Sequence, residues 1–149
     1  MINKKKLILI VDDDDNIRML LEFVLRKYYK IVTREDGLSA TSWLMAGNFP
    51  DLIIADLEMP RLNGYHFLKN IRESGFFHDI PLVMLSGYES NEIKQKCLQQ
   101  GADDYWIKPF NPADKVAKIE ILTENRISCQ ENTDKYGVEF FTYSPGLFQ

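Results

Sequence analysis

The sequence predicts an α/β fold in which five strand-and-helix units form a doubly wound, five-stranded parallel sheet. Five short apolar runs, each followed by a stretch with helical signals, support this: LILIV (7–11), KIVTR (30–34), DLIIAD (51–56), PLVMLS (81–86) and DYWIK (104–108). The first, third and fourth runs are almost wholly apolar, as expected for central strands that helices cover on both faces. KIVTR is more polar, which favours an edge strand. Right-handed crossovers place the ligand crevice of such a sheet beyond the carboxyl ends of its strands.

Helical spacing of apolar residues follows three of the runs. The residues are Ile17, Leu20, Leu21, Val24 and Leu25 after the first run, Gly64, Phe67, Leu68 and Ile71 after the third, and Ile93, Cys97 and Leu98 after the fourth. This spacing places each set on one buried helix stripe. Gly101 is expected to end the fourth helix. Asn111 is expected to cap a last helix, with Pro112 in its first turn.

Length and composition indicate a single globular domain. The chain has 149 residues, of which 27% are charged and 45% hydrophobic, and its formal net charge is -4. This charge gives no general attraction to nucleic acid or anionic membranes, so we expect neither as a partner. The apolar run near the start is too short for a signal peptide or a spanning helix. We expect a domain over residues 1–123 and an extension over 124–149, with a strand near 138–143 and no separate effector domain.

Two cysteines, Cys97 and Cys129, are the whole thiol content. They form no CxxC motif and no cluster with histidine, so neither a disulfide framework nor a zinc site is expected. This pattern suits a reducing compartment, and we expect the protein in the cytoplasm.

Polar residues at the predicted strand ends carry the functional prediction. Asp12 and Asp13 follow the first run, and the third, fourth and fifth runs end in Asp56, Ser86 and Lys108. Each residue could instead have a purely structural role. An aspartate can cap the start of a helix, and serine and lysine are common at solvated strand ends. Asp56 is the hardest to explain in that way, because an acid that ends a buried strand is costly unless it is paired or holds a cation. In a parallel sheet all five would share one crevice.

The same residues indicate phosphoryl chemistry. Clustered carboxylates without histidine or cysteine favour magnesium, or manganese, held by one or two carboxylates and water. Lys108 could then pair with a phosphoryl oxygen, Ser86 could donate a hydrogen bond, and the small Gly87 would let its backbone N–H approach the same group. Attack by the Asp56 carboxylate on phosphorus would give an acyl phosphate.

Four motifs in this order resemble the receiver domain of two-component response regulators over roughly residues 5–123. They are ILIVDDDDNIR, PDLIIADLEMPRLNGYHFLKNIR, IPLVMLSGY and GADDYWIKPF. The intervals also match, since Ser86 follows Asp56 by 30 residues and Lys108 follows Ser86 by 22. The resemblance implies a flavodoxin-like sheet of strand order 2-1-3-4-5. It is closest in kind to stand-alone receivers of the chemotaxis-regulator type.

The resemblance implies a phosphorylation switch rather than an enzyme acting on an external substrate. Asp56 would accept a phosphoryl group from a sensor histidine kinase or a histidine phosphotransfer protein, and the domain would catalyse its own phosphorylation and dephosphorylation. Magnesium would be held by the carboxylates of Asp13 and Asp56 and the backbone carbonyl of Glu58, and Asp12 would act mainly through water. Glu58 and Tyr88 occupy variable positions of the family and would tune the phosphoryl lifetime.

The resemblance also implies how the signal leaves the site. Ser86 would move toward the phosphoryl group and Tyr105 would follow it inward. A readout surface made of the fourth helix, fifth strand and fifth helix would then bind an unknown downstream protein, and a homodimer is left open. The Lys108-Pro109 peptide bond would be cis.

Three rival functions remain open at this point. One is a magnesium-dependent phosphatase that forms an aspartyl phosphate, although the expected DxDxT motif on the first strand is absent. Another is a flavodoxin-like cofactor binder, whose phosphate the acidic loop DDDDNIR would repel. The last is a phosphorylation-silent receiver that serves as a scaffold, although its polar site positions are all filled.

Overall fold

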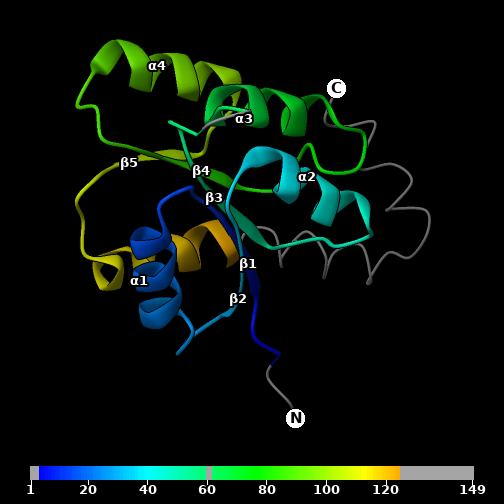
Figure 1. The fold of residues 1–149 in the computed structure, drawn as a ribbon, viewed down its shortest axis with the longest axis vertical. Coiled ribbons are helices and arrows are strands. Elements are labelled where there is room, and N and C mark those ends of the chain that lie inside the picture. The colour runs from blue at the N-terminus through cyan, green and yellow to red at the C-terminus, as the bar shows by residue number, and fades with distance from the viewer. Residues whose placement is uncertain (1–3, 60–61, 125–149) are drawn as a thin grey trace.

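A computed structural model of the chain describes residues 4–59 and 62–124. Its elements, in chain order, are β1 (Leu7–Val11), α1 (Asp15–Leu25), β2 (Lys30–Arg34), α2 (Gly37–Met45), β3 (Leu52–Asp56), α3 (Gly64–Glu73), β4 (Leu82–Ser86), α4 (Asn91–Gln100), β5 (Asp104–Ile107) and the 3-10 turn η1 (Pro112–Lys115). Residues 116–124 continue from this turn as α-helix. The five strands are parallel and lie in the order β2-β1-β3-β4-β5 (Figure 1), so the predicted fold class and strand order are confirmed.

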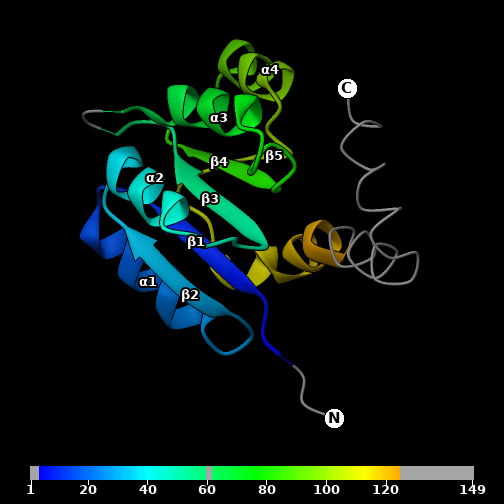
Figure 2. The same cartoon turned by 90° about the vertical axis from the view of Figure 1, so that its right-hand side faces the viewer.

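Two hydrophobic cores lie on opposite faces of this sheet. One core joins the sheet to α2, α3 and α4 through residues such as Leu44, Phe67 and Cys97. The other joins it to α1 and the helical segment 116–124 through Leu25 and Ile119. Figure 2 shows the helices on both faces. All five residues of β3 and of β4 are buried, which explains why these two strands are apolar up to their last residues, Asp56 and Ser86.

Gly101 and Asn111 mark helix ends as expected from the sequence, and Asp14 caps a third helix. The side chain of Asp14 caps α1 by accepting from the backbone N–H of Asn16 and Ile17. Gly101 ends α4 with φ at 114°, a left-handed conformation that residues with a Cβ rarely adopt. Asn111 caps η1, and its side chain accepts from the N–H of Ala113. These ends are local, so the sequence was sufficient to place them.

The edge position predicted for KIVTR is confirmed, because β2 pairs with β1 alone among the described strands. The Lys108-Pro109 peptide bond is cis, as the resemblance implied. The strand expected near 138–143, Cys129 and nearly all of the extension lie outside the described residues. No helix within the described ranges is long and apolar enough to cross a membrane.

Candidate functional site

The carboxyl ends of β1, β3, β4 and β5 bring the predicted site residues to one edge of the sheet. Asp12 follows β1, Asp56 ends β3, and these strands are neighbours in register, with Val11 beside Ala55. Asp12 and Asp56 are buried, with 0% and 2% of their surface exposed. Lys108 follows β5 and its Nζ lies 3.0 Å from Oδ1 of Asp56 and 3.4 Å from Oδ2 of Asp12. The solvated strand end considered for Lys108 is therefore excluded.

Burial dominates the protonation of Asp56. Burial is the largest of the causes that together raise the pKa of this carboxyl to about 7. The negative charge of Asp12 acts in the same direction, and the hydrogen-bonding and charge of Lys108 only partly oppose them. Burial would lower the pKa of the Lys108 ammonium, but its contacts with Asp56 and Asp12 outweigh that cost and raise it. Lys108 therefore stays charged, and one cation faces two buried acids.

Asp12, Asp13 and Asp56 could hold a divalent cation. Carboxylate oxygens of the three residues lie within 4.8 Å of one another. Burial raises the pKa of Asp12, and Oδ1 of Asp56 is buried without a hydrogen-bond partner of proper geometry, although it contacts the Lys108 ammonium. Hard oxygen ligands with uncompensated negative charge are the donor set that magnesium prefers, so the residues present fit the ion.

Ser86 donates its hydroxyl proton to the side chain of Glu58, a contact that the sequence had not predicted. Ser86 Oγ donates to Glu58 Oε2 at 3.2 Å, and the backbone N–H of Gly87 donates to Glu58 Oε1 at 3.4 Å. Glu58 itself is exposed. The structure therefore gives one carboxylate two donors that had been assigned to a phosphoryl group.

Tyr105 is connected to Ser86 through Tyr88. The N–H of Tyr88 donates to Ser86 Oγ at 2.9 Å, and the Tyr105 hydroxyl donates to the Tyr88 carbonyl at 2.9 Å. Tyr105 is 6% exposed, and burial raises the pKa of its hydroxyl. A continuous hydrogen-bonded path therefore joins the end of β4 to β5.

Two further residues support the acidic end of the sheet through contacts that the sequence did not predict. Arg18, on α1, donates to the backbone carbonyl of Asp12 at 2.6 Å and pairs with Asp15. Gly64, at the start of α3, lies so close to β3 that a Cβ there would be 2.2 Å from the Asp56 carbonyl oxygen. Neither the Arg18 contact with the Asp12 carbonyl nor the close approach of Gly64 to Asp56 could be expected from the sequence, because each depends on how a helix packs beside the sheet.

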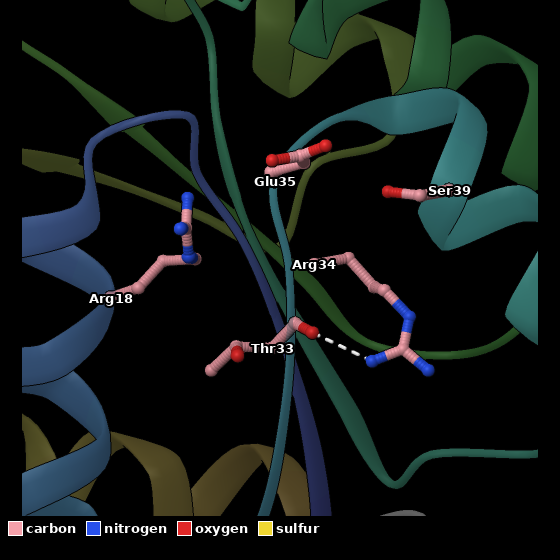
Figure 3. Close-up of a pocket in the computed structure, with 5 residues that line it drawn as sticks. All are labelled: Arg18, Thr33, Arg34, Glu35 and Ser39. Atoms are coloured by element: carbon pink, nitrogen blue, oxygen red, sulfur yellow. Dashed lines mark hydrogen bonds between the residues drawn. The ribbon is translucent and has the colours of Figure 1, made fainter.

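A shallow pocket of about 310 Å³ lies beside β2, and two of its lining residues, Arg18 and Arg34, contact the backbone of Asp12. Its lining residues are Arg18, Thr33, Arg34, Glu35 and Ser39 (Figure 3). The two arginine side chains point apart in Figure 3. Arg34 donates to the Thr33 carbonyl and lies over the Trp43 ring, while Arg18 holds the end of β1. The arginines are thus engaged in internal contacts, and we assign no ligand to this pocket.

Comparison with known proteins identifies the class to which this fold and site belong. Residues 8–120 match the response regulator receiver domain, and the chain belongs to this family of two-component signalling domains. The phosphate regulon transcriptional regulatory protein PhoB of Escherichia coli (strain K12) is 39% identical over 107 residues, which are 71% of this chain and 46% of PhoB. The chain therefore spans less than half of that relative.

Two other matches widen this picture. The chemotaxis response regulator CheY4 of Vibrio cholerae has a solved structure that is 30% identical, with a TM-score of 0.74 over 80% of this chain and 99% of that one. The hybrid signal transduction histidine kinase D of Dictyostelium discoideum is 33% identical over 118 residues, which are 79% of this chain and 8% of the kinase. These matches do not favour the phosphatase, the cofactor binder or the silent scaffold that the sequence had left open.

Proposed function

We propose that this receiver domain is a phosphorylation switch whose acceptor is Asp56. The observation that carries the proposal is the ion pair between the Lys108 ammonium and Oδ1 of Asp56, at 3.0 Å, in a site where Asp12 supplies a second buried acid. An isolated pair of buried acids is costly, and one lysine offsets only part of that cost. The arrangement suits a site that receives further positive charge and a phosphoryl group.

Asp56 is the nucleophile in this proposal. One of its carboxylate oxygens forms the bond to phosphorus while the phosphorus–nitrogen bond of a donor phosphohistidine breaks. The departing imidazole nitrogen keeps the electron pair and takes a proton from solvent. Because burial raises the pKa of Asp56 to about 7, the reactive carboxylate form becomes dominant only above that pH in the absence of a cation.

Asp12, Asp13 and Asp56 would hold magnesium, or manganese, together with the backbone carbonyl of Glu58. When bound, the cation supplies positive charge that offsets the acidic cluster and the phosphoryl oxygens. Lys108 would contact another phosphoryl oxygen. Ser86 and Gly87 would donate to the same group. Positioning and charge neutralisation of this kind account for most of the catalysis of phosphoryl transfer.

The phosphoryl donor would be a sensor histidine kinase or a histidine phosphotransfer protein. The signal would pass along the path from Ser86 through Tyr88 to Tyr105. It would leave through the readout surface formed by α4, β5 and the helical segment 116–124, which would bind a downstream protein. Hydrolysis of the aspartyl phosphate by the domain itself would reset the switch.

Phosphorylation by a small donor tests the assignment. The protein is incubated with magnesium and acetyl phosphate, and the added phosphate is located by mass spectrometry after reduction of the acyl phosphate with borohydride. We expect one modification, on Asp56, that is absent from Asp56→Asn and from wild-type protein in excess chelator. Asp114→Asn, which changes an exposed aspartate of η1, is the matched control and should be labelled normally. Undiminished labelling of Asp56→Asn would refute the acceptor.

A further inference from the structure

The Glu58 carboxylate spans the two hydrogen-bond donors at the end of β4. Its Oε2 accepts from Ser86 Oγ at 3.2 Å, and its Oε1 accepts from the backbone N–H of Gly87 at 3.4 Å. A phosphoryl group on Asp56 would need these same two donors. One internal carboxylate therefore stands where the proposed function requires phosphoryl oxygens to be bound.

Glu58 and a phosphoryl group cannot use these donors together. The Ser86 hydroxyl has a single proton, and its oxygen already accepts from the N–H of Tyr88 at 2.9 Å. The N–H of Gly87 is likewise a single donor. A hydroxyl that turns its proton toward a phosphoryl oxygen must therefore release Glu58.

We propose that the Glu58 carboxylate is an internal latch: in the unphosphorylated protein it occupies the Ser86 and Gly87 donors, and phosphorylation of Asp56 displaces it. This inference rests on the proposed function, since it assigns a regulatory role within the same site. The latch is defined by the contacts of Glu58 with Ser86 and Gly87. It holds the β4–α4 connection in its unphosphorylated conformation and so opposes activation.

Charge gives phosphorylation a second means of opening the latch. Glu58 follows Asp56 by two residues, and its carboxylate is held at the end of the neighbouring strand β4, so charge added to Asp56 acts on it at short range. A phosphoryl group adds a charge of about -1.5 to -2 to the site. This added charge repels the Glu58 carboxylate at the same time as the phosphoryl oxygens compete for its donors.

Opening of the latch is connected to the readout surface. Ser86 accepts from the Tyr88 N–H, and the Tyr88 carbonyl accepts from the Tyr105 hydroxyl. A movement of Ser86 away from Glu58 therefore strains or rearranges the hydrogen bonds that position Tyr105 on β5. Loss of the latch should shift this path even before any phosphoryl group is present.

The size of the effect should be modest, because Glu58 is exposed and water competes for its oxygens. Exposed charged contacts contribute little, so we expect removal of the latch to tighten binding of a phosphoryl mimic by about two- to fivefold. A change of this size is measurable by titration.

Two substitutions of Glu58 separate the latch from simple charge removal. Glu58→Met removes both acceptor oxygens, whereas Glu58→Gln removes the same charge but keeps one oxygen that can accept from Ser86. Glu89→Gln is the matched control, since Glu89 is also exposed and makes none of the hydrogen bonds to Ser86 or Gly87 found among the described residues. All three changes lie on the surface, so the variants should fold normally.

The experiment measures amide spectra of each variant with and without beryllofluoride at saturating magnesium. Without beryllofluoride, we expect the Ser86, Gly87, Tyr88 and Tyr105 signals of Glu58→Met to move part of the way toward their positions in activated wild type. The affinity for beryllofluoride should increase in the order wild type, Glu58→Gln, Glu58→Met, and Glu89→Gln should match wild type.

Three other outcomes would overturn the latch, and they can be distinguished from one another. Equal gains for Glu58→Gln and Glu58→Met would assign the effect to charge alone. Unchanged spectra and affinity in Glu58→Met, with a normal wild-type response, would overturn the latch and leave the proposed function intact. A wild-type protein that gives no response to beryllofluoride and magnesium would overturn the proposed function and the latch together.

Discussion

The ammonium group of Lys108 lies 3.0 Å from Oδ1 of Asp56, and this ion pair spans the end of β4, because β4 separates the strands that carry the two residues. The same ammonium reaches Oδ2 of Asp12 at 3.4 Å. A single side chain from the edge strand β5 thus connects the acidic ends of β1 and β3. Lys108 is therefore placed to sense any change of charge at the acceptor.

Replacement of Lys108 should impair the response to phosphorylation more than phosphorylation itself. In Lys108→Ala we expect beryllofluoride to produce little of the wild-type shift at Tyr105, since a charge-assisted contact of about 1.5–3 kcal/mol is lost. Amide spectra with and without beryllofluoride measure this. Lys69→Ala, which removes an exposed lysine of α3 outside the readout surface, is the control and should keep the full shift. A full shift in Lys108→Ala would show that Lys108 does not link the acceptor to the readout surface.

Asp56 should make the metal-free protein less stable as the pH rises. Its pKa is raised from 3.8 to about 7, mainly by burial, so between these values the folded protein binds a proton that the unfolded chain has lost. Stability from this group is therefore greatest at low pH and declines as the pH rises to about 7. Asp56→Asn removes this dependence and should be more stable than wild type above pH ~7 by about 1–3 kcal/mol.

Urea unfolding in a chelator, at pH values from about 4 to about 8, measures this difference. The comparison of wild type with Asp56→Asn isolates Asp56 from the other titrating groups, and the exposed substitution Asp114→Asn should leave the profile unchanged. Parallel profiles for wild type and Asp56→Asn would contradict the raised pKa.

The sequence was sufficient to predict the strand ends and insufficient to predict what lies beside them. Asp56 and Lys108 could be assigned to one crevice because parallel strands gather their carboxyl ends at one edge, whatever the details of packing. The Glu58 contact with Ser86 could not be predicted, because Glu58 lies in the connection after β3, where no periodic pattern indicates the direction of a side chain. The tether from Arg18 to the Asp12 carbonyl was missed for a related reason, since a surface arginine on α1 has many possible partners.

Asp13 offers a test of the metal site because its side chain is exposed, so its replacement should not disturb the core. Its carboxylate lies with those of Asp12 and Asp56 in one group of oxygens within 4.8 Å. We expect Asp13→Ala to weaken magnesium binding by about tenfold or more, or about 1.4 kcal/mol, without loss of stability. Titration calorimetry measures the affinity, and Asp114→Ala should bind magnesium as wild type does. Equal affinities in Asp13→Ala and wild type would exclude Asp13 as a ligand.

Gly64 should be essential for the shape of the acceptor strand. A Cβ at this position would lie 2.2 Å from the Asp56 carbonyl oxygen and 2.7 Å from Cα of Leu57, and both are backbone atoms that cannot rotate away. Helix propensity alone would favour alanine over glycine in α3 by about 1 kcal/mol. The clash should reverse that sign, so we expect Gly64→Ala to lower the free energy of unfolding by about 2–4 kcal/mol.

The matched control for Gly64 is Gly75→Ala, where a Cβ would meet no atom within 4 Å. We expect this variant to stay within about 0.5 kcal/mol of wild type in chemical unfolding. Because the clash at Gly64 falls on the carbonyl of Asp56 itself, the part of Gly64→Ala that remains folded should also bind beryllofluoride more weakly than wild type. A stable Gly64→Ala with normal beryllofluoride affinity would show that α3 can move away from β3 without displacing the acceptor.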